Sequence, residues 1–332
     1  MVSSPDVRVS AKISIDGDDR LSLDYNPAGL RDTIVSIGDR YLNHGRKGED
    51  LEQELGDLWD EIFYAARFIF VTGPEAGHLV ALILEAREFG HLARSGGQEG
   101  AMMPNGQRLW TDLPYLVQEL EGMWAMESYK FGITERANLA AFTARLCAAG
   151  VCPEELSRCA LWLFKETLEI ERPLYLRGTF ERNTRPCVAD SLPACLAWLQ
   201  FNKFKLVKLS TIDYNSTTHD DEGESALSTK PGPLAASAGI AQDGFSIKRW
   251  LFWRRRFKEL YSTGDSEIMK LARACFEEAV QAGRLIGLDI PGEKQYLACV
   301  FEALDRKLAA RDFVGSVEPS DIEIDMNWAG VD

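Results

Sequence analysis

Three carboxylates at helical spacing are the first group in this sequence that could support chemistry. Asp57, Asp60 and Glu61 stand at i, i+3 and i+4, so they would share one face of a helix. Carboxylates grouped in this way can hold Mg²⁺, which prefers oxygen ligands and keeps several waters. The same spacing fits a solvated acidic first turn, which the helix dipole favours. We prefer the acidic turn and keep the magnesium site as the alternative.

A second group combines cations with aromatic side chains. The run from 249 to 258 carries Arg254, Arg255 and Arg256 next to Trp250 and Trp253. Guanidinium groups recognise diphosphates and carboxylates through paired hydrogen bonds. These five residues are therefore our candidate ligand-binding residues. The alternative is an amphipathic helix whose cations face water and whose aromatic rings fill the core.

An acidic cluster, a basic cluster and aromatic-rich helices together suggest one kind of enzyme. It would be a Mg-dependent enzyme acting on an isoprenoid diphosphate or another secondary metabolite. The Asp-Asp-x-x-Asp signature is missing, however, and the sequence has no phosphate loop, dinucleotide fingerprint or nucleophile elbow. The pair Glu166 and Glu169 is expected to be exposed rather than to act as acid and base. No catalytic residue is singled out.

The overall charge and the cysteine and histidine content exclude several classes of function. The formal net charge of −14 at pH 7 argues against nucleic acid as the main partner. The chain contains seven cysteines without a Cys-x-x-Cys pair and four histidines without an i, i+4 pair, so we assign no cofactor. No apolar run is long enough to span a bilayer, and the N-terminus lacks a secretory signal. We therefore expect a cytoplasmic protein and assign no oligomeric state.

The stretch from 57 to 92 reads as two helices joined by a short turn, and we expect the rest of the chain to be organised around it. Apolar residues recur at helical spacing in both halves: Trp59, Ile62, Phe63, Ala66 and Phe70, then Leu79, Leu82, Ile83, Ala86 and Phe89. The sequence Thr72-Gly73-Pro74 stops the first helix. This pattern predicts an antiparallel helical hairpin with both apolar faces buried.

Further helices are expected over 27–43, 110–124, 134–150, 153–173, 191–204, 243–261, 265–286 and 292–313. The fold class is thus all-α, an irregular multi-helix bundle of about ten helices. Residues 1–26 are expected to form an N-terminal arm or small β-hairpin. Residues 27–313 would be a single helical domain with a mobile insertion at about 210–243, which is rich in Ser, Thr, Asp, Gly and Pro. Residues 314–332 would be an acidic tail.

Several of these segments are similar to a known family. The hairpin, LWTDLPYLVQELEGMW, ANLAAFTARLCAAGV followed by CALWLFKETLE, and FSIKRWLFWRRRFKEL resemble a domain-of-unknown-function family from filamentous ascomycete fungi. The resemblance covers roughly residues 28–310 without the insertion. It implies a helical fold and a fungal origin. Its motifs are packing patterns, so no catalytic residue is carried over.

The sequence thus favours a helical binding protein without demonstrated catalysis. Its ligand would be an apolar small molecule held between helices or a protein partner on an exposed groove. Whether the protein is an enzyme is left open.

Overall fold

A computed structural model of the chain describes residues 26–70, 73–93, 100–175, 185–215, 227–312, 314–317 and 322. Within these residues it contains twelve α-helices, a 3₁₀ turn and a π-helical turn, with two isolated β-bridges and no strand. The predicted all-α fold is confirmed, with more helices than the ten expected. The predicted hairpin within residues 1–26 lies outside the described residues, as does the glycine-rich segment 94–99.

The chain divides into two compact units, Leu23–Trp253 in one and Met1–Ser22 with Arg254–Asp332 in the other. The boundary falls inside helix α9 (Ile247–Tyr261). The single helical domain expected over 27–313 therefore stays a prediction, and each unit is described separately.

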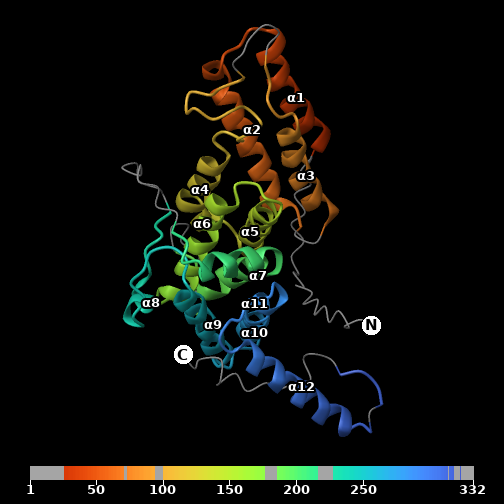
Figure 1. Cartoon of the computed structure of the whole chain (residues 1–332), viewed down its shortest axis with the longest axis vertical. Coiled ribbons are helices and arrows are strands. Elements are labelled where there is room, and N and C mark those ends of the chain that lie inside the picture. The colour runs from red at the N-terminus through yellow and green to blue at the C-terminus, as the bar shows by residue number, and fades with distance from the viewer. Residues whose placement is uncertain are drawn as a thin grey trace. The chain divides into compact units, whose positions relative to one another are not determined.

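Helix α5 (Ile133–Ala148) forms the centre of the first unit. It packs most extensively against α7 (Val188–Thr211) and also contacts α2 (Gly48–Phe68), α3 (Pro74–Glu88) and α6 (Pro153–Phe164) (Figure 1). Its sequence explains this position, because small alanines allow neighbouring helices to approach closely and favour the helix itself. Almost every residue from Arg136 to Cys147 is buried.

The predicted hairpin is present as α2 and α3, which lie beside α1 (Pro27–Asn43) (Figure 1). Helix α2 begins earlier than expected, at Gly48, because the charged segment before Asp57 is itself helical. Two expected core residues are exposed: Phe70 is 63% exposed and Phe89 is 41% exposed. Both lie just past the C-terminal end of their helix, where the helical spacing no longer decides which side a residue faces.

The helix expected from residue 110 begins only at Leu116, as α4 (Leu116–Met126). Leu113 and Tyr115 adopt left-handed backbone angles, with φ of 50° and 65°, which a right-handed helix does not contain. The loop is held in place from α2, because Trp59 Nε1 donates a hydrogen bond to the carbonyl of Pro114 at 2.8 Å. Trp59 itself is completely buried.

Helix α6 continues into a π-helical turn, Lys165–Glu169. Helix α7 runs on to Thr211, past the expected end near 204, with a break in helical geometry at Asn202. Within the expected insertion, residues 227–243 contain α8 (Pro233–Ser237) and a buried Leu227. Residues 216–226 lie outside the described residues, and the mobility expected there stays a prediction.

The second unit contains the last turns of α9 followed by α10 (Ser266–Val280), α11 (Ala282–Leu285) and α12 (Glu293–Ala309). Asp265 caps α10 by accepting hydrogen bonds from the backbone of Glu267 and Ile268. In the expected acidic tail, Ile322 is buried and its carbonyl accepts a hydrogen bond from Arg273. No described helix has both the length and the apolar character needed to cross a bilayer.

Candidate functional site

The three candidate magnesium ligands of the alternative interpretation lie on the exposed side of α2. Asp57, Asp60 and Glu61 are all exposed, and they fall in the third and fourth turns of the helix rather than the first. The N-terminal dipole therefore does not explain them. Among the described residues, no group of three histidine, cysteine or acidic side chains could hold a metal ion.

Carboxylates from α4 and its end gather near the same side of α2. Partial burial of its carboxylate raises the pKa of Asp60, and repulsion from Glu127 and Asp57 raises it further. Burial likewise raises the pKa of Glu119, which is also repelled by Asp60. Because these groups share negative charge at close range, the α2–α4 surface carries a local excess of negative charge.

The same side of α2 continues into an aromatic pair that sequence reasoning missed. Tyr64 is 48% exposed and its ring centroid lies 5.0 Å from that of the half-buried Phe68. Between them, Arg67 packs over the ring of Phe131 at 3.9 Å and pairs with Glu135 at 2.6 Å. The sequence did contain a signal for this pair. Tyr64 and Phe68 are spaced i, i+4 and fall on the same helical face as Asp57, away from the apolar face. We call Asp57, Asp60, Glu61, Tyr64 and Phe68 the α2 surface stripe.

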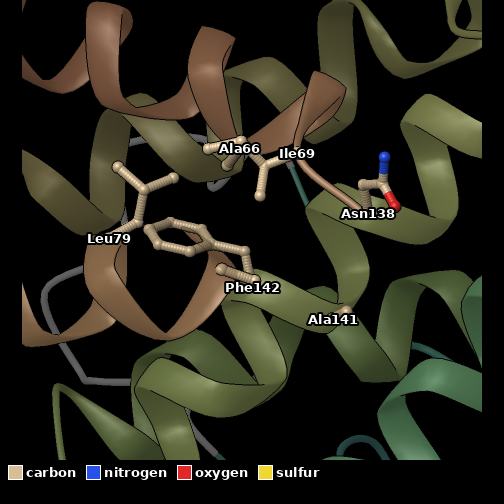
Figure 2. Close-up of a pocket in the computed structure, with 7 residues that line it drawn as sticks. Ala66, Ile69, Leu79, Asn138, Ala141 and Phe142 are labelled. Carbon is tan, nitrogen blue, oxygen red and sulfur yellow. The ribbon is translucent and has the colours of Figure 1, made fainter. Parts of the chain in front are cut away.

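A small cavity lies on the opposite, buried side of the hairpin. Figure 2 shows Leu79 beside the ring of Phe142, with Ala66 and Ile69 near them and Asn138 at one edge of the group. Asn138 donates a hydrogen bond to the carbonyl of Arg67 at 2.8 Å. The cavity holds about 10 Å³, enough for about one water, and is far below the several hundred Å³ of a metabolite pocket. Its lining consists of Ala66, Ile69, Ala76, Leu79, Asn138, Ala141 and Phe142.

The five candidate ligand-binding residues differ in their exposure along α9. Trp250, Trp253 and Arg254 are at most 2% exposed, whereas Arg255 and Arg256 are partly exposed beside Glu259. The structure therefore buries both tryptophans, as the amphipathic-helix alternative expects, but it also buries one arginine. The ligand-binding role of these residues stays a prediction.

Trp253 belongs to a buried ion-pair network with Glu169 and Arg249. Arg249 Nε donates to Glu169 Oε1 at 2.6 Å, and Nη2 donates to Oε2 at 2.9 Å. Trp253 Nε1 donates to Oε1 at 2.7 Å, and the backbone N–H of Gly232 donates to Oε2 at 2.7 Å. Both charged side chains are 0% exposed. The exposed position expected for Glu169 is therefore wrong.

The remaining donors of Arg249 are also satisfied. Its Nη1 donates to the carbonyls of Thr229 and Gly244 at 2.8 and 2.7 Å, and Nη2 reaches the carbonyl of Lys230 at 3.4 Å. The network thus joins the π-helical turn, the segment from 227 to 232 and α9. A buried pair with every donor occupied fixes these three segments in one arrangement.

Arg254, five residues further along α9, lacks such partners. Its Nε and Nη1 are buried without a hydrogen-bond acceptor, and it is 1% exposed. Burial lowers the pKa of Arg254 to about 10, and the charge of Glu293 partly opposes this shift. The Glu293 carboxylate accepts hydrogen bonds from the backbone of Gly283 and Arg284. Two buried arginines of one helix thus differ in their partners: Arg249 is paired with a carboxylate, whereas Nε and Nη1 of Arg254 have no acceptor.

The described helices define an all-α protein with a large buried core and the acidic, aromatic α2 surface stripe. The chain belongs to the family described as protein of unknown function (DUF3632), whose family model matches residues 59–257. The expected membership in a family of unknown function is confirmed, while its restriction to filamentous ascomycetes stays a prediction.

One curated relative has a name that refers to biosynthesis. The oxopyrrolidines biosynthesis cluster protein G of Penicillium oxalicum (strain 114-2 / CGMCC 5302) is 29% identical over 252 residues, which cover 71% of this chain and 68% of the relative. No solved structure matches the chain.

Proposed function

We propose that this protein acts in the fungal cytoplasm by binding a partner protein, and that it works alongside enzymes of secondary-metabolite biosynthesis. The observation that carries the proposal is the aromatic pair Tyr64 and Phe68 on the exposed side of α2, next to an excess of negative charge. Exposed tyrosines with an apolar ring and a polar hydroxyl are well suited to protein interfaces.

The small cavity between α2, α3 and α5 cannot enclose a small-molecule ligand. A metabolite of a few hundred daltons needs several hundred Å³, whereas the cavity between α2, α3 and α5 holds about 10 Å³. Recognition at a surface does not need such an internal volume. Of the two ligand classes that the sequence left open, we propose the protein partner, because the exposed pair Tyr64 and Phe68 can contact it at the surface.

The relative supports the biosynthetic setting. Its name places it in an oxopyrrolidines biosynthesis cluster, and it shares 29% identity with this chain over 252 residues. We extend the role in secondary-metabolite biosynthesis to this protein, but not the particular metabolite. No observation favours the magnesium-dependent alternative over this proposal.

Native mass spectrometry of the tagged protein, gently isolated from a fungal host after mild crosslinking, tests the proposal. We expect a complex that contains a second protein in a fixed stoichiometry. A bare monomer in repeated crosslinked preparations, or a monomer carrying an extra few hundred daltons, would contradict the proposal. The second result would indicate a bound metabolite instead.

A further inference from the structure

We propose that the α2 surface stripe is the docking face, and that its occupant is a basic, amphipathic helix of the partner protein. This inference rests on the proposed function, because it names the surface and the chemistry of the same interaction. The argument uses the direction of the stripe, its unneutralised charge and its exposed rings.

Four of the five stripe residues follow one line along α2, and Asp60 lies to one side of that line. Successive residues of an α-helix turn by about 100°, so Asp57, Glu61, Tyr64 and Phe68 stay within about 60° of one another around the helix axis. Phe68 lies eleven positions after Asp57, which corresponds to about 16 Å along the axis. That length matches about three turns of a second helix laid alongside, the usual geometry of helix recognition.

The N-terminal half of the stripe carries charge that the described part of the chain leaves unneutralised. Asp57 accepts a hydrogen bond from Gln53, and no described lysine or arginine forms an ion pair with Asp57, Asp60 or Glu61. Nearby Glu119 adds a further negative charge. Lysine or arginine side chains on the partner would offset this repulsion, so the charge selects a basic partner.

The C-terminal half of the stripe supplies apolar contact. Tyr64 is 48% exposed, and Phe68 is half-buried against it. The backbone beneath them is fixed, because Asn138 of α5 donates to the carbonyl of Arg67. A partner helix would therefore place a basic turn beside the acidic half and an apolar turn on rings that need little reordering.

Charge also argues against two other occupants. A second copy of this chain, with a net charge of −14, would bring the same carboxylates against the stripe. Nucleic acid would be repelled for the same reason. The basic helix of another protein remains as the occupant that the surface fits.

A peptide-binding assay on the full-length protein tests the chemistry of the surface. The probe is a fluorescein-labelled 14-residue helix of leucine and lysine, and the comparison is the same peptide with glutamate in place of lysine. We expect saturable fluorescence polarisation with the lysine peptide alone. The variant Tyr64→Ala/Phe68→Ala should weaken binding at least about tenfold. The matched control Phe204→Ala, at a ring that is 42% exposed on α7, should leave binding unchanged.

Charge variants separate the stripe from the overall charge of the protein. Asp57→Asn/Asp60→Asn/Glu61→Gln should weaken binding at least about tenfold. The control variant Asp32→Asn/Glu302→Gln/Asp305→Asn removes three exposed carboxylates elsewhere. It should weaken peptide binding much less. Equal losses from the two triple variants would overturn the inference, because they would indicate diffuse attraction to an acidic protein.

The isolated complex separates this inference from the proposed function. With Tyr64→Ala/Phe68→Ala, we expect the partner to be lost from the crosslinked complex, while the Phe204→Ala variant retains it. A partner that stays bound to the stripe variant overturns the inference and leaves the proposed function standing. The absence of any partner from the wild-type protein overturns both.

Discussion

The two arginines of α9 allow a direct test of how burial and pairing determine stability. Arg249 and Arg254 are both at most 1% exposed, but only Arg249 has a carboxylate partner and a full set of acceptors. Arg249→Met should therefore destabilise the protein strongly. Glu169 would keep the hydrogen bonds from Trp253 and Gly232 but would remain buried without a compensating charge.

Removing one partner from a buried ion pair costs about 3–5 kcal/mol. For a unit of this size, such a loss lowers the melting temperature by about 6–20 °C. Arg254→Met should cost much less, because its Nε and Nη1 have no acceptor to lose and the nearby buried Glu293 keeps its hydrogen bonds from the backbone of Gly283 and Arg284. Thermal and urea unfolding followed by tryptophan fluorescence would measure both effects, with far-UV circular dichroism as a check on helix content.

A double variant keeps this prediction testable if Arg249→Met folds poorly. Glu169→Leu/Arg249→Met removes both charges, so it should recover much of the stability lost in the single variant. Equal melting temperatures for Arg249→Met and Arg254→Met would refute the reasoning. A double variant less stable than Arg249→Met alone would also refute it, because the penalty could then not come from an unpaired Glu169.

Three further outcomes follow from the structure. Gly232→Ala should lower the free energy of unfolding in urea by about 1–3 kcal/mol, because the added Cβ would lie 2.7 Å from Cβ of Glu169. Gly77→Ala, where the added Cβ meets open space, should raise it by about 0.5–1 kcal/mol. Because its pKa is raised, Asp60 binds a proton more readily in the folded state than in the unfolded chain, so its contribution to stability is lost as the pH rises above the ordinary pKa of an aspartate. Asp60→Asn should therefore raise the melting temperature at pH 7 and reduce the dependence of the melting temperature on pH. A lower melting temperature at pH 7 would contradict this reasoning. Burial raises the pKa of Cys152 to about 11, so iodoacetamide at pH 8 should label it much more slowly in native than in urea-unfolded protein, as read by peptide mass spectrometry.

Most helices could be located from the sequence because the signals that form them are local. Pro27 and Pro153 occupy the first positions of α1 and α6, as the fixed φ of proline favours. The alanine-rich stretch before Gly150 became the central helix α5. Helical periodicity also placed most of the buried residues of α2 and α3, since the side that a residue faces follows from its spacing within the helix.

What the sequence could not indicate is which distant groups meet. Glu169 and Arg249 are 80 residues apart, and nothing near either residue marks it as one half of a buried pair. The left-handed geometry at Tyr115 is supported by the packing of the preceding loop and the contact from Trp59, so local propensity placed the start of α4 too early.

The α2 surface stripe shows the same division between sequence and structure. Spacing alone put Asp57, Asp60 and Glu61 on one face of a helix, but exposure decided that Tyr64 and Phe68 continue that face. Local sequence therefore determined the helices and their registers, because hydrogen bonding and periodicity act within a few residues. Only the tertiary structure decided which charges are buried and which aromatic rings remain exposed, since burial depends on every element that packs nearby.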